Sequence, residues 1–466
     1  MIDASAAHAA VEARDPRFDG RFFLGVTSTG IYCRCVCTAK TPKPANRRFF
    51  PSAAAAEKAG FRPCRLCRPE LAPGDAPVDS ARRLAHQALT RIEAGVLEEE
   101  GLERIASGLG VTGRHLRRVM NETFGASPID IAQTCRLLAA KRLLADSDLP
   151  MTEIAFASGF RSVRRFNAVM RERYGLAPQK MRGRNAARRG DAITLRLTAR
   201  GAYNAEPIFS FMARRALPEM EIANAQRYAR ALAIGDARGW IDVRAEHNGI
   251  ALTVSDTLVP VLRPLIAHVR GAFDLDTDCA AVDAHLAIGE EGVRIAGGLD
   301  GFEIAARAVL GQQVSLSAAC TLAARLVAEF GEELENPPKD LRRLFPSPAR
   351  VAEAGPEAIA KIGMPLKRAQ TLHRLSCAVR DGLNLQRGAI ASGREGLAEI
   401  TGVGPWTVEY VALRALGDPD AFPENDAVLR AELGDADADR WRPWRGYAAM
   451  RLWRAAERKR ANRKAA

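Results

Sequence analysis

The sequence carries Cys33-Arg-Cys-Val-Cys37 and, 26 residues later, Cys64-Arg-Leu-Cys67. Two ligands on one tight turn can face one ion, and a second pair on another turn completes a tetrahedron, so this spacing is typical of a closed zinc site. Small buried cysteines or two disulfides are the alternatives. Because Met1 to Ala10 does not read as a signal peptide, we expect a reducing cytoplasm, which disfavours disulfides. Zinc on Cys33, Cys37, Cys64 and Cys67 is the first hypothesis, with Cys35 as an alternative ligand.

The charge of the chain is unevenly distributed. Lys and Arg outnumber Asp and Glu by 32 to 19 over residues 1–190 and equal them, 36 to 36, over residues 191–466, so the net charge of +13 lies in the first part. Such a basic excess indicates a polyanionic partner. The sequence contains no lipidation motif and no apolar run that could span a membrane, so we expect nucleic acid and no membrane.

A chain of 466 residues is too long for one ordinary domain and suggests three or four. The Pro/Gly-rich segment Leu71–Ser80 and the basic segment Arg182–Gly190 are interpreted as linkers. An alternating strand is expected around Phe22 to Tyr32 in the cysteine module. After the second linker, alternating stretches predict a small sheet, with strands at 193–198, 222–234, 240–246 and 250–254 and a helix from Glu206. From Leu258 onward, helical periodicity predicts an all-helical part.

Between the linkers a helix-turn-helix pattern occurs twice. Leu102–Thr112 gives a short helix, a glycine turn and a threonine N-cap, and the second copy runs from Met151 to Met170. Each second helix has an apolar face for docking and a basic face suited to base edges and phosphates. An ordinary helical hairpin with a solvated basic face is the alternative. The side chains predicted to contact DNA are Arg114, His115, Arg117, Arg118, Arg161, Ser162, Arg164 and Arg165.

Several residues of this region resemble the AraC-type DNA-binding domain. They are Glu153, Gly159, Phe160 and Tyr174-Gly-Leu-Ala-Pro178. In that domain two such motifs lie on either side of a linking helix, which corresponds here to Pro128–Leu144.

The first 180 residues as a whole resemble the N-terminal half of the Ada family of DNA-repair regulators. The matching segments are Phe18-Asp-Gly-Arg-Phe22, Thr29-Gly-Ile-Tyr-Cys-Arg34 and Gly60-Phe-Arg-Pro-Cys-Arg-Leu-Cys-Arg-Pro69. The resemblance implies that the four thiolates bind Zn²⁺ and that Cys33 takes a methyl group from a methylphosphotriester in DNA. Methylation would change the formal charge of the site from −2 to −1 and raise its affinity for DNA, which would switch on transcription. We therefore expect promoter DNA and RNA polymerase as partners. Cys35 stands where the family usually has proline.

In the C-terminal part the strongest local signal is Leu397-Ala-Glu-Ile-Thr-Gly-Val-Gly-Pro-Trp-Thr407. Gly402 and Gly404 allow a close approach of the backbone, and Pro405 occupies the first helical position that proline favours. This pattern predicts a helix-hairpin-helix whose N–H groups bind a DNA phosphate without reading sequence. A plain connection between two helices is the alternative.

Asp426 follows within twenty residues of Trp406, and an acid beyond a proline turn is often only a helix cap. However, Phe302–Ser315, Ile362–Ala369 and Trp441–Tyr447 together with the hairpin resemble AlkA-type 3-methyladenine DNA glycosylases over residues 191–456. The resemblance implies that Asp426 is the catalytic acid. Three aromatic residues near it can be part of the hydrophobic core or can line a pocket for the base. The resemblance further implies a base pocket of Trp406, Tyr410 and Trp453 and DNA contacts by Gly402, Gly404, Thr407 and Gln313.

Three departures define the subclass. Trp406 stands where strand-cutting relatives carry a nucleophilic lysine, no cysteine follows Asp426 to hold an Fe–S cluster, and Gln313 replaces an apolar wedge of the family. The chain also contains no Pro-Cys-His motif, so O6-alkylguanine transfer is not expected.

The sequence thus predicts a multidomain, mainly α chain with four parts: a small zinc-bound α+β module (1–75), an AraC-type double helix-turn-helix domain (80–182), a small α+β subdomain (191–290) and an all-helical helix-hairpin-helix DNA glycosylase domain (291–456). We expect a bacterial, cytoplasmic and nucleoid-associated protein that accepts methyl groups on Cys33, activates transcription, and hydrolyses the glycosidic bond of 3-methyladenine and 7-methylguanine as a monofunctional glycosylase. The alternative is a transcription regulator whose C-terminal half is an inactive DNA clamp. A regulator that senses zinc is disfavoured, because a closed four-thiolate site holds its metal tightly.

Overall fold

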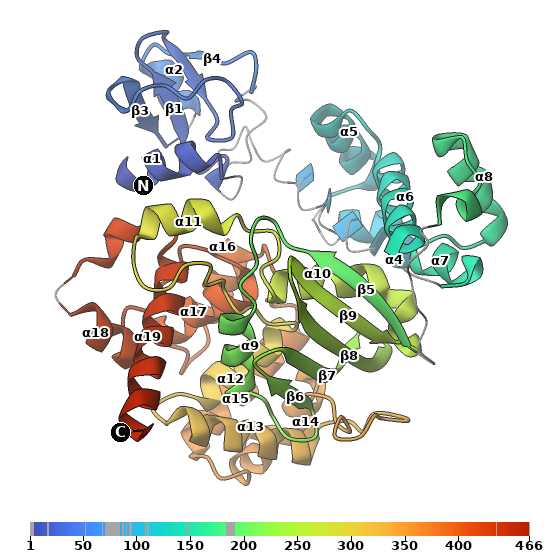
Figure 1. The fold of residues 1–466 in the computed structure, drawn as a ribbon, viewed down its shortest axis with the longest axis vertical. Coiled ribbons are helices and arrows are strands. Elements are labelled where there is room, and N and C mark those ends of the chain that lie inside the picture. Colours follow the sequence, from blue (N-terminus) through green and yellow to red (C-terminus); the bar gives the residue numbers. More distant parts are fainter. Residues whose placement is uncertain are drawn as a thin grey trace. The chain divides into compact units, whose positions relative to one another are not determined.

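The structure is a computed structural model, and it describes residues 4–15, 18–51, 53–67, 69, 84–85, 88–89, 91–92, 96–107, 109, 111–146, 149–182, 192–434 and 436–465 (Figure 1). The segment 71–80 and residues 183–190, both predicted as linkers, lie outside this set. The chain divides into two compact units, residues 1–139 with 439–443 and residues 140–438 with 444–466. It is a multidomain and mostly helical protein, as predicted. None of the described helices is long and apolar enough to cross a membrane.

The cysteine module is built on a four-stranded sheet. Its elements are α1 (Ala4–Ala13), β1 (Phe23–Val26), β2 (Ile31–Cys33), β3 (Arg47–Phe50), α2 (Ala53–Lys58) and β4 (Arg62–Pro63), and the strand order is β3-β1-β2-β4. The segment expected as one strand is therefore a hairpin, because the chain reverses at Thr27–Gly30, where Gly30 takes a φ of 64°. Phe18, Phe22 and Leu24 pack with α1 on one side of this small core.

The helix-turn-helix elements lie where the sequence predicts them. They are α4 (Val96–Ser107), α5 (Gly113–Phe124), α6 (Pro128–Asp146), α7 (Met151–Ala157) and α8 (Val163–Tyr174). Thr112 caps α5 by accepting a hydrogen bond from the backbone N–H of His115 at 3.3 Å. Ser162 caps α8 in the same way, through the N–H of Arg165 at 3.1 Å. The helix α5 thus begins at its predicted threonine cap, and α8 begins at a serine cap of the same kind.

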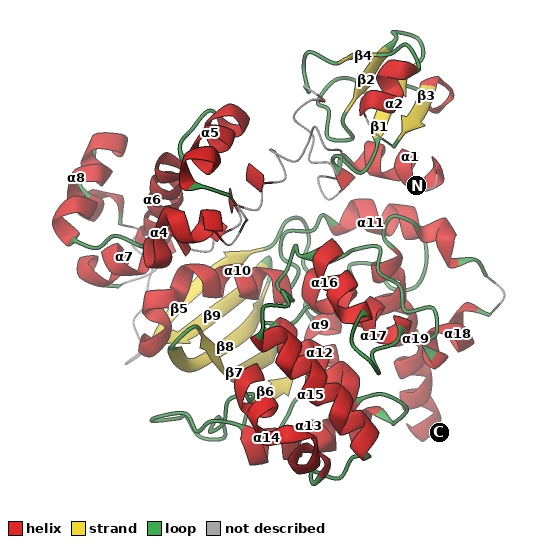
Figure 2. Cartoon of the chain, turned by 180° about the vertical axis from the view of Figure 1, so that it is seen from behind, coloured by secondary structure: helices red, strands yellow, loops and turns green. Residues whose placement is uncertain are grey.

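A five-stranded antiparallel sheet opens the C-terminal half. Its strands are β5 (Ala192–Thr198), β6 (Glu221–Asn224), β7 (Arg227–Ile234), β8 (Ala237–Glu246) and β9 (Gly249–Ser255), in the order β5-β9-β8-β7-β6. Figure 2 shows this sheet in yellow beside the red helices of the all-helical part. The stretch 222–234, expected as one strand, is two strands. The turn between them is held by Asn224, whose Oδ1 accepts from the N–H of Gln226 at 2.9 Å.

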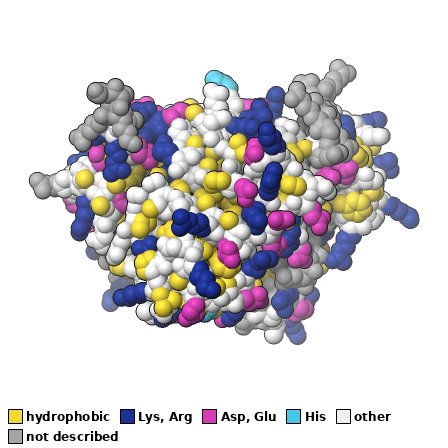
Figure 3. Space-filling model, turned by 90° about the horizontal axis from the view of Figure 1, so that it is seen from below, with side chains coloured by type: hydrophobic (Ala, Val, Ile, Leu, Met, Phe, Trp, Pro, Cys, Tyr) yellow, Lys and Arg dark blue, Asp and Glu magenta, His cyan; other side chains and the backbone are white. Residues whose placement is uncertain are grey.

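Helices make up most of the remaining chain. They are α9 (Glu206–Ala213), α10 (Leu262–Ala272), α11 (Cys279–Leu286), α12 (Gly301–Leu310), α13 (Leu316–Phe330), α14 (Pro348–Ala360), α15 (Leu366–Arg380), α16 (Ile390–Ala398), α17 (Pro405–Val411), α18 (Ala427–Leu433) and α19 (Arg445–Ala465). On the face shown in Figure 3, Lys and Arg side chains are interspersed with Asp and Glu.

A buried ion network joins the sheet to α12. The Arg230 guanidinium lies 2.6 Å from the Glu303 carboxylate, and that of Arg307 lies 2.7 Å from Glu221. Burial alone would raise the pKa of Glu221, but Arg307 and Arg230 hold it below its ordinary value. Removing one partner of such a buried pair typically costs about 3–5 kcal/mol, so the network fixes α12 against the sheet.

Candidate functional site

Parallel pairing of two short strands brings the cysteine pairs together. Ile31 pairs with Arg62 and Tyr32 with Pro63, so the next residues along each strand, Cys33 and Cys64, are neighbours. The sulfur atoms of Cys33, Cys37, Cys64 and Cys67 all lie within 4.8 Å of one another. Tetrahedral Zn–S bonds of about 2.3 Å require S···S separations of about 3.8 Å, so the four thiolates fit a zinc ion with little adjustment.

Cys35 lies outside this cluster. Its Sγ faces the backbone carbonyl of Asp15 at 3.5 Å, and its side chain packs in the core around Phe18 and Leu24. Burial raises the pKa of the Cys35 thiol. Its neighbour Arg34 instead supports the ligands, because its backbone N–H donates to the Cys67 sulfur at 3.4 Å.

The basic faces of α5 and α8 are open to solvent. Arg114, Arg117 and Arg118 are exposed and His115 is half-buried, while Leu116, Val119 and Met120 on the opposite face are buried. On the second motif the exposed residues are Arg161, Ser162, Arg164 and Arg165. Arg118 is partly neutralised by Glu122 at 3.2 Å.

The glycine turn between α16 and α17 has the conformation of a tight hairpin. Gly402 takes a φ of 98°, and a Cβ there would lie 2.0 Å from the Thr371 hydroxyl oxygen. Gly404 caps α17 in extended backbone with open space beside it, and Pro405 stands at the helix start. The Thr407 side chain is buried and accepts from Gln312 Nε2 at 3.1 Å, so Thr407 can offer DNA only its backbone N–H.

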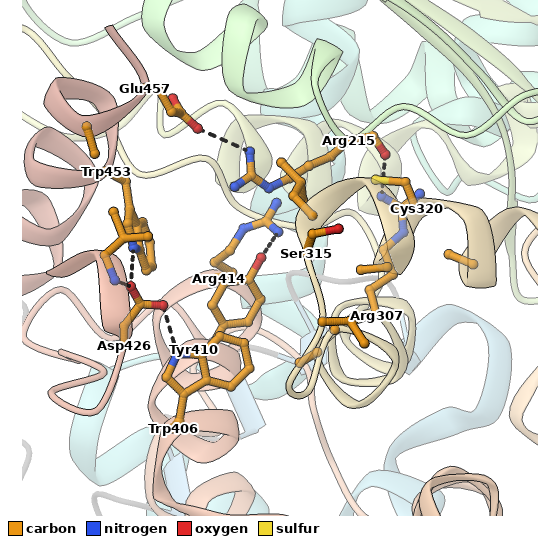
Figure 4. Close-up of a pocket in the computed structure, with 18 of the residues that line it drawn as sticks. Arg215, Arg307, Ser315, Cys320, Trp406, Tyr410, Arg414, Asp426, Trp453 and Glu457 are labelled. Carbon is orange, nitrogen blue, oxygen red and sulfur yellow. Dashed lines mark hydrogen bonds and ion pairs between the residues drawn. The ribbon is translucent and has the colours of Figure 1, made fainter. Parts of the chain in front are cut away.

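A cavity of about 470 Å³ opens beside this hairpin (Figure 4). Trp406, Tyr410, Trp453 and Asp426 all line it, as do Val314 and Leu316. The rings of Trp406 and Tyr410 are stacked, with centroids 5.1 Å apart and planes at 16°. The centroids of Tyr410 and Trp453 are 6.1 Å apart. The structure thus brings the three predicted aromatic residues and the predicted carboxylate into one site.

Four N–H groups hold the Asp426 carboxylate. As the N-cap of α18, its Oδ1 accepts from the backbone N–H groups of Val428 and Leu429, both at 3.0 Å. The same oxygen accepts from Trp453 Nε1 at 3.1 Å, and Oδ2 accepts from Trp406 Nε1 at 3.0 Å. Asp426 is therefore both the helix cap and the acid of the cavity.

The predicted DNA contact Gln313 lies next to two exposed apolar side chains. Gln313 is exposed, takes the left-handed φ of 56° and lies at the start of the segment that carries Val314 and Leu316. Those two apolar side chains are themselves 36 % and 42 % exposed. Gln312, which precedes Gln313, donates to the Gly402 carbonyl at 3.1 Å and so links this segment to the hairpin.

Sequence reasoning missed the charged residues of the cavity. Arg215, Arg307, Arg414, Glu457 and Arg460 also line it. Arg414 lies one helical turn beyond Tyr410, so the spacing could have indicated that both side chains share the helix face that lines the cavity. Arg215 comes from the segment after α9, far away in the sequence, and no local pattern marks it.

The ring of Tyr410 is in contact with this positive charge. Nη1 of Arg414 donates to the Tyr410 hydroxyl at 2.7 Å. Burial alone would raise the pKa of Tyr410, but the guanidinium groups of Arg414 and Arg215 lower it below the ordinary value.

Comparison with known families assigns these sites to a class. Residues 6–70 match the metal binding domain of Ada, 105–184 a helix-turn-helix domain, 194–300 the AlkA N-terminal domain and 306–454 the HhH-GPD superfamily of base excision DNA repair proteins. The chain is thus a zinc-binding, helix-turn-helix protein fused to a DNA glycosylase of the helix-hairpin-helix class.

Individual relatives narrow this class. The chain is 35 % identical to the probable bifunctional transcriptional activator/DNA repair enzyme AlkA of Mycobacterium tuberculosis, over 98 % of this chain and 97 % of the relative. It is 32 % identical to DNA-3-methyladenine glycosylase 2 of Escherichia coli, over 54 % of this chain and 93 % of the relative. It is also 32 % identical to the bifunctional transcriptional activator/DNA repair enzyme Ada of Escherichia coli, over 38 % of this chain and 49 % of the relative.

The chain belongs to the family of bifunctional transcriptional activators and DNA repair enzymes that joins an Ada-type N-terminal half to an AlkA-type glycosylase. The resemblance deduced from the sequence is thereby confirmed, and so is zinc as the metal of the four-cysteine cluster. DNA is the partner of such a protein.

Proposed function

We propose that the C-terminal half hydrolyses the N-glycosidic bond of alkylated purines such as 3-methyladenine and 7-methylguanine, with Asp426 as the catalytic carboxylate. One observation carries this proposal: four N–H donors fix the Asp426 carboxylate on the wall of an aromatic cavity of about 470 Å³. A cap alone needs only the backbone N–H groups of its helix. The two indole donors add an orientation toward the cavity that capping does not require.

The chemistry suits a base that is already a good leaving group. Methylation at N3 or N7 makes the purine cationic, so the enzyme need not protonate it strongly. The faces of Trp406 and Tyr410 attract such a cation. As the glycosidic bond breaks, the Asp426 carboxylate stabilises the positive charge that develops on the sugar and orients the attacking water.

We propose a monofunctional enzyme that leaves the DNA strand intact. Among the described residues that line the cavity, none is a lysine, and Trp406 occupies the first turn of α17 after the hairpin. Hydrolysis by water then needs no Schiff base. Gly402, Gly404 and the N–H groups at the start of α17 are proposed to hold the DNA phosphate, with Gln313 and its apolar neighbours facing the duplex.

In the N-terminal half we propose that the Cys33 thiolate attacks the methyl carbon of a methylphosphotriester. The S–C bond forms as the C–O bond breaks, and the phosphodiester anion leaves with the electron pair. The backbone N–H of Arg34 donates to the sulfur of Cys67, whereas among the described residues no backbone N–H donates to the sulfur of Cys33. Because such a hydrogen bond stabilises a thiolate and lowers its reactivity, Cys33 is the better nucleophile of these two.

Methylation is proposed to act as the switch for transcription. Four thiolates on Zn²⁺ carry a formal charge of −2, and one thioether reduces it to −1, which lowers repulsion toward DNA phosphates. The exposed arginines of α5 and α8 would then hold promoter DNA, and RNA polymerase is the proposed partner of the activated protein. We propose that the chain has four domains with the boundaries 1–75, 80–182, 191–290 and 291–456.

Parallel incubation with two damaged DNAs tests both halves. Duplex that contains N-methylpurines should lose free base, and duplex that contains methylphosphotriesters should transfer methyl to Cys33, located by a peptide map. Methyl on Cys35 would refute the nucleophile assignment. Binding to both DNAs without base release would favour the alternative, an inactive clamp.

A further inference from the structure

Two arginines form one end of the aromatic cavity. Figure 4 shows the guanidinium groups of Arg215 and Arg414 side by side next to Tyr410, across the cavity from Trp453. Arg414 is held in place because its Nε donates to the Ala296 carbonyl at 2.8 Å and its Nη1 to the Tyr410 hydroxyl. The Arg215 guanidinium lies 3.5 Å from the centroid of the Phe211 ring. Both groups are therefore fixed in position.

These two cations are poorly compensated. Arg307, which lines the same cavity, lies 2.7 Å from Glu221 and 3.1 Å from Glu303. By contrast, Arg414 forms no ion pair with a carboxylate among the described residues, and Arg215 has only the long ion pair with Glu457, at 3.9 Å, and a hydrogen bond from its Nη1 to the Phe211 carbonyl at 3.2 Å.

Burial makes this lack of compensation costly. Arg414 is only 7 % exposed, and burial lowers the pKa of Arg215, the sign of a cation held away from water. A buried charge that is met mainly by neutral acceptors, with at most one distant carboxylate, is incompletely compensated, so an acceptor atom supplied by a ligand would be bound favourably. A ligand that brought an amino group or positive charge to this end would be opposed.

We infer that Arg215 and Arg414 are specificity-determining residues that hydrogen-bond the exocyclic oxygen of the excised base. The inference rests on the proposed glycosylase function. A purine with its sugar at Asp426 extends its six-membered ring away from that carboxylate, toward the arginines on the other side of the cavity. The preferred substrates are therefore purines with an oxygen at C6, as in alkylated guanine, rather than the amino group of alkylated adenine.

A matched pair of damaged bases tests this preference. 7-Methylhypoxanthine and 7-methyladenine carry the same methyl group at N7, and they differ at C6, which bears an oxygen or an amino group, and at N1, which carries a hydrogen only in the oxo base. Excision of each from the same duplex sequence is measured under single-turnover conditions, with spontaneous base loss subtracted. The wild-type protein should excise the oxo base about 10-fold faster or more, the range expected for one hydrogen bond to a charged group.

The decisive variant is Arg215→Met, which keeps the apolar stem beside Phe211 and removes the guanidinium. Its ratio of oxo to amino excision should fall by about 10-fold, and because both rates come from one preparation, the ratio does not depend on the folded fraction. Arg350→Met is the control, since Arg350 is exposed and does not line the cavity. Its ratio should equal that of the wild type.

The outcomes separate the two claims. A wild-type preference for 7-methyladenine, or an unchanged ratio in Arg215→Met, overturns the role of the arginines while leaving the glycosylase intact. If the wild-type protein releases none of the three bases 7-methylhypoxanthine, 7-methyladenine and 3-methyladenine, the glycosylase function is refuted, and this inference is refuted with it.

Discussion

Replacement of Asp426 by asparagine tests the cavity most directly, because the two side chains have the same shape. Asparagine has one acceptor oxygen and one NH₂ group. With the oxygen toward Val428, Leu429 and Trp453, three of the four hydrogen bonds remain. The amide nitrogen then faces Trp406 Nε1 across 3.0 Å, where two donors meet. The opposite orientation of the amide would lose three bonds, so we expect the first.

The expected loss of stability and the expected loss of catalytic rate in Asp426→Asn differ in size. One lost charge-assisted hydrogen bond costs about 1.5–3 kcal/mol, and a domain stable by about 5–15 kcal/mol stays folded after such a loss. The loss of the negative charge from the transition state costs about 10²–10³ in rate. A fall in rate of that size therefore cannot be explained by unfolding and reports the missing charge.

The assay is single-turnover release of N-methylpurines from duplex DNA by Asp426→Asn, together with thermal unfolding and binding to DNA with an abasic site. Release should nearly vanish, while binding persists through the hairpin. Asp300→Asn is the control, because Asp300 caps α12 through the N–H of Glu303 and does not line the cavity. If Asp426→Asn releases 3-methyladenine at the parental rate, Asp426 is only a helix cap and the proposed mechanism is wrong.

Four further outcomes are expected. Cys33→Ser should abolish methyl uptake and damage-induced transcription while base excision persists, as measured with labelled methylphosphotriester DNA and a reporter gene. Cys64→Ala should bring zinc below one ion per chain and unfold the module locally, since metal binding contributes to its folding; full zinc content with an intact fold would contradict the ligand set. Gly404→Ala should fold normally, because open space surrounds that position, yet bind DNA more weakly, whereas Gly402→Ala should lower the melting temperature through its clash with Thr371. The wild-type enzyme should leave the strand uncut and give no borohydride-trapped adduct, and an adduct would disprove hydrolysis by water.

Local chemistry explains how much could be predicted from the sequence. The caps Thr112 and Ser162, the proline start of α17 and the cysteine spacing all act within a few residues, so their outcome follows from the sequence alone. The strands were less well predicted. The turn after Asn224 contains neither glycine nor proline, and its signal was the asparagine side chain that bonds Gln226.

The charged end of the cavity was not predictable for a different reason. Arg215, Arg414 and Glu457 come from three elements that only tertiary packing brings together, and each in isolation is typical of a solvated surface. The carboxylate and the aromatic residues were found only because the resemblance to a family pointed to them. Spacing alone left Asp426 as either a cap or an acid, and the structure shows that it is the cap of α18 as well as a wall of the cavity.

N–H groups from α17, α18 and α19 all donate to the Asp426 carboxylate. The group that links the three helices is therefore also the proposed catalytic group. Its orientation is supplied while the protein folds and does not wait for a damaged base. The helix that begins at the hairpin carries Trp406 in its first turn, so a protein sliding along intact DNA would present a finished site to every nucleotide that it passes. Recognition of damage would then depend on how readily each base leaves the duplex, and hardly at all on rearrangement of the enzyme.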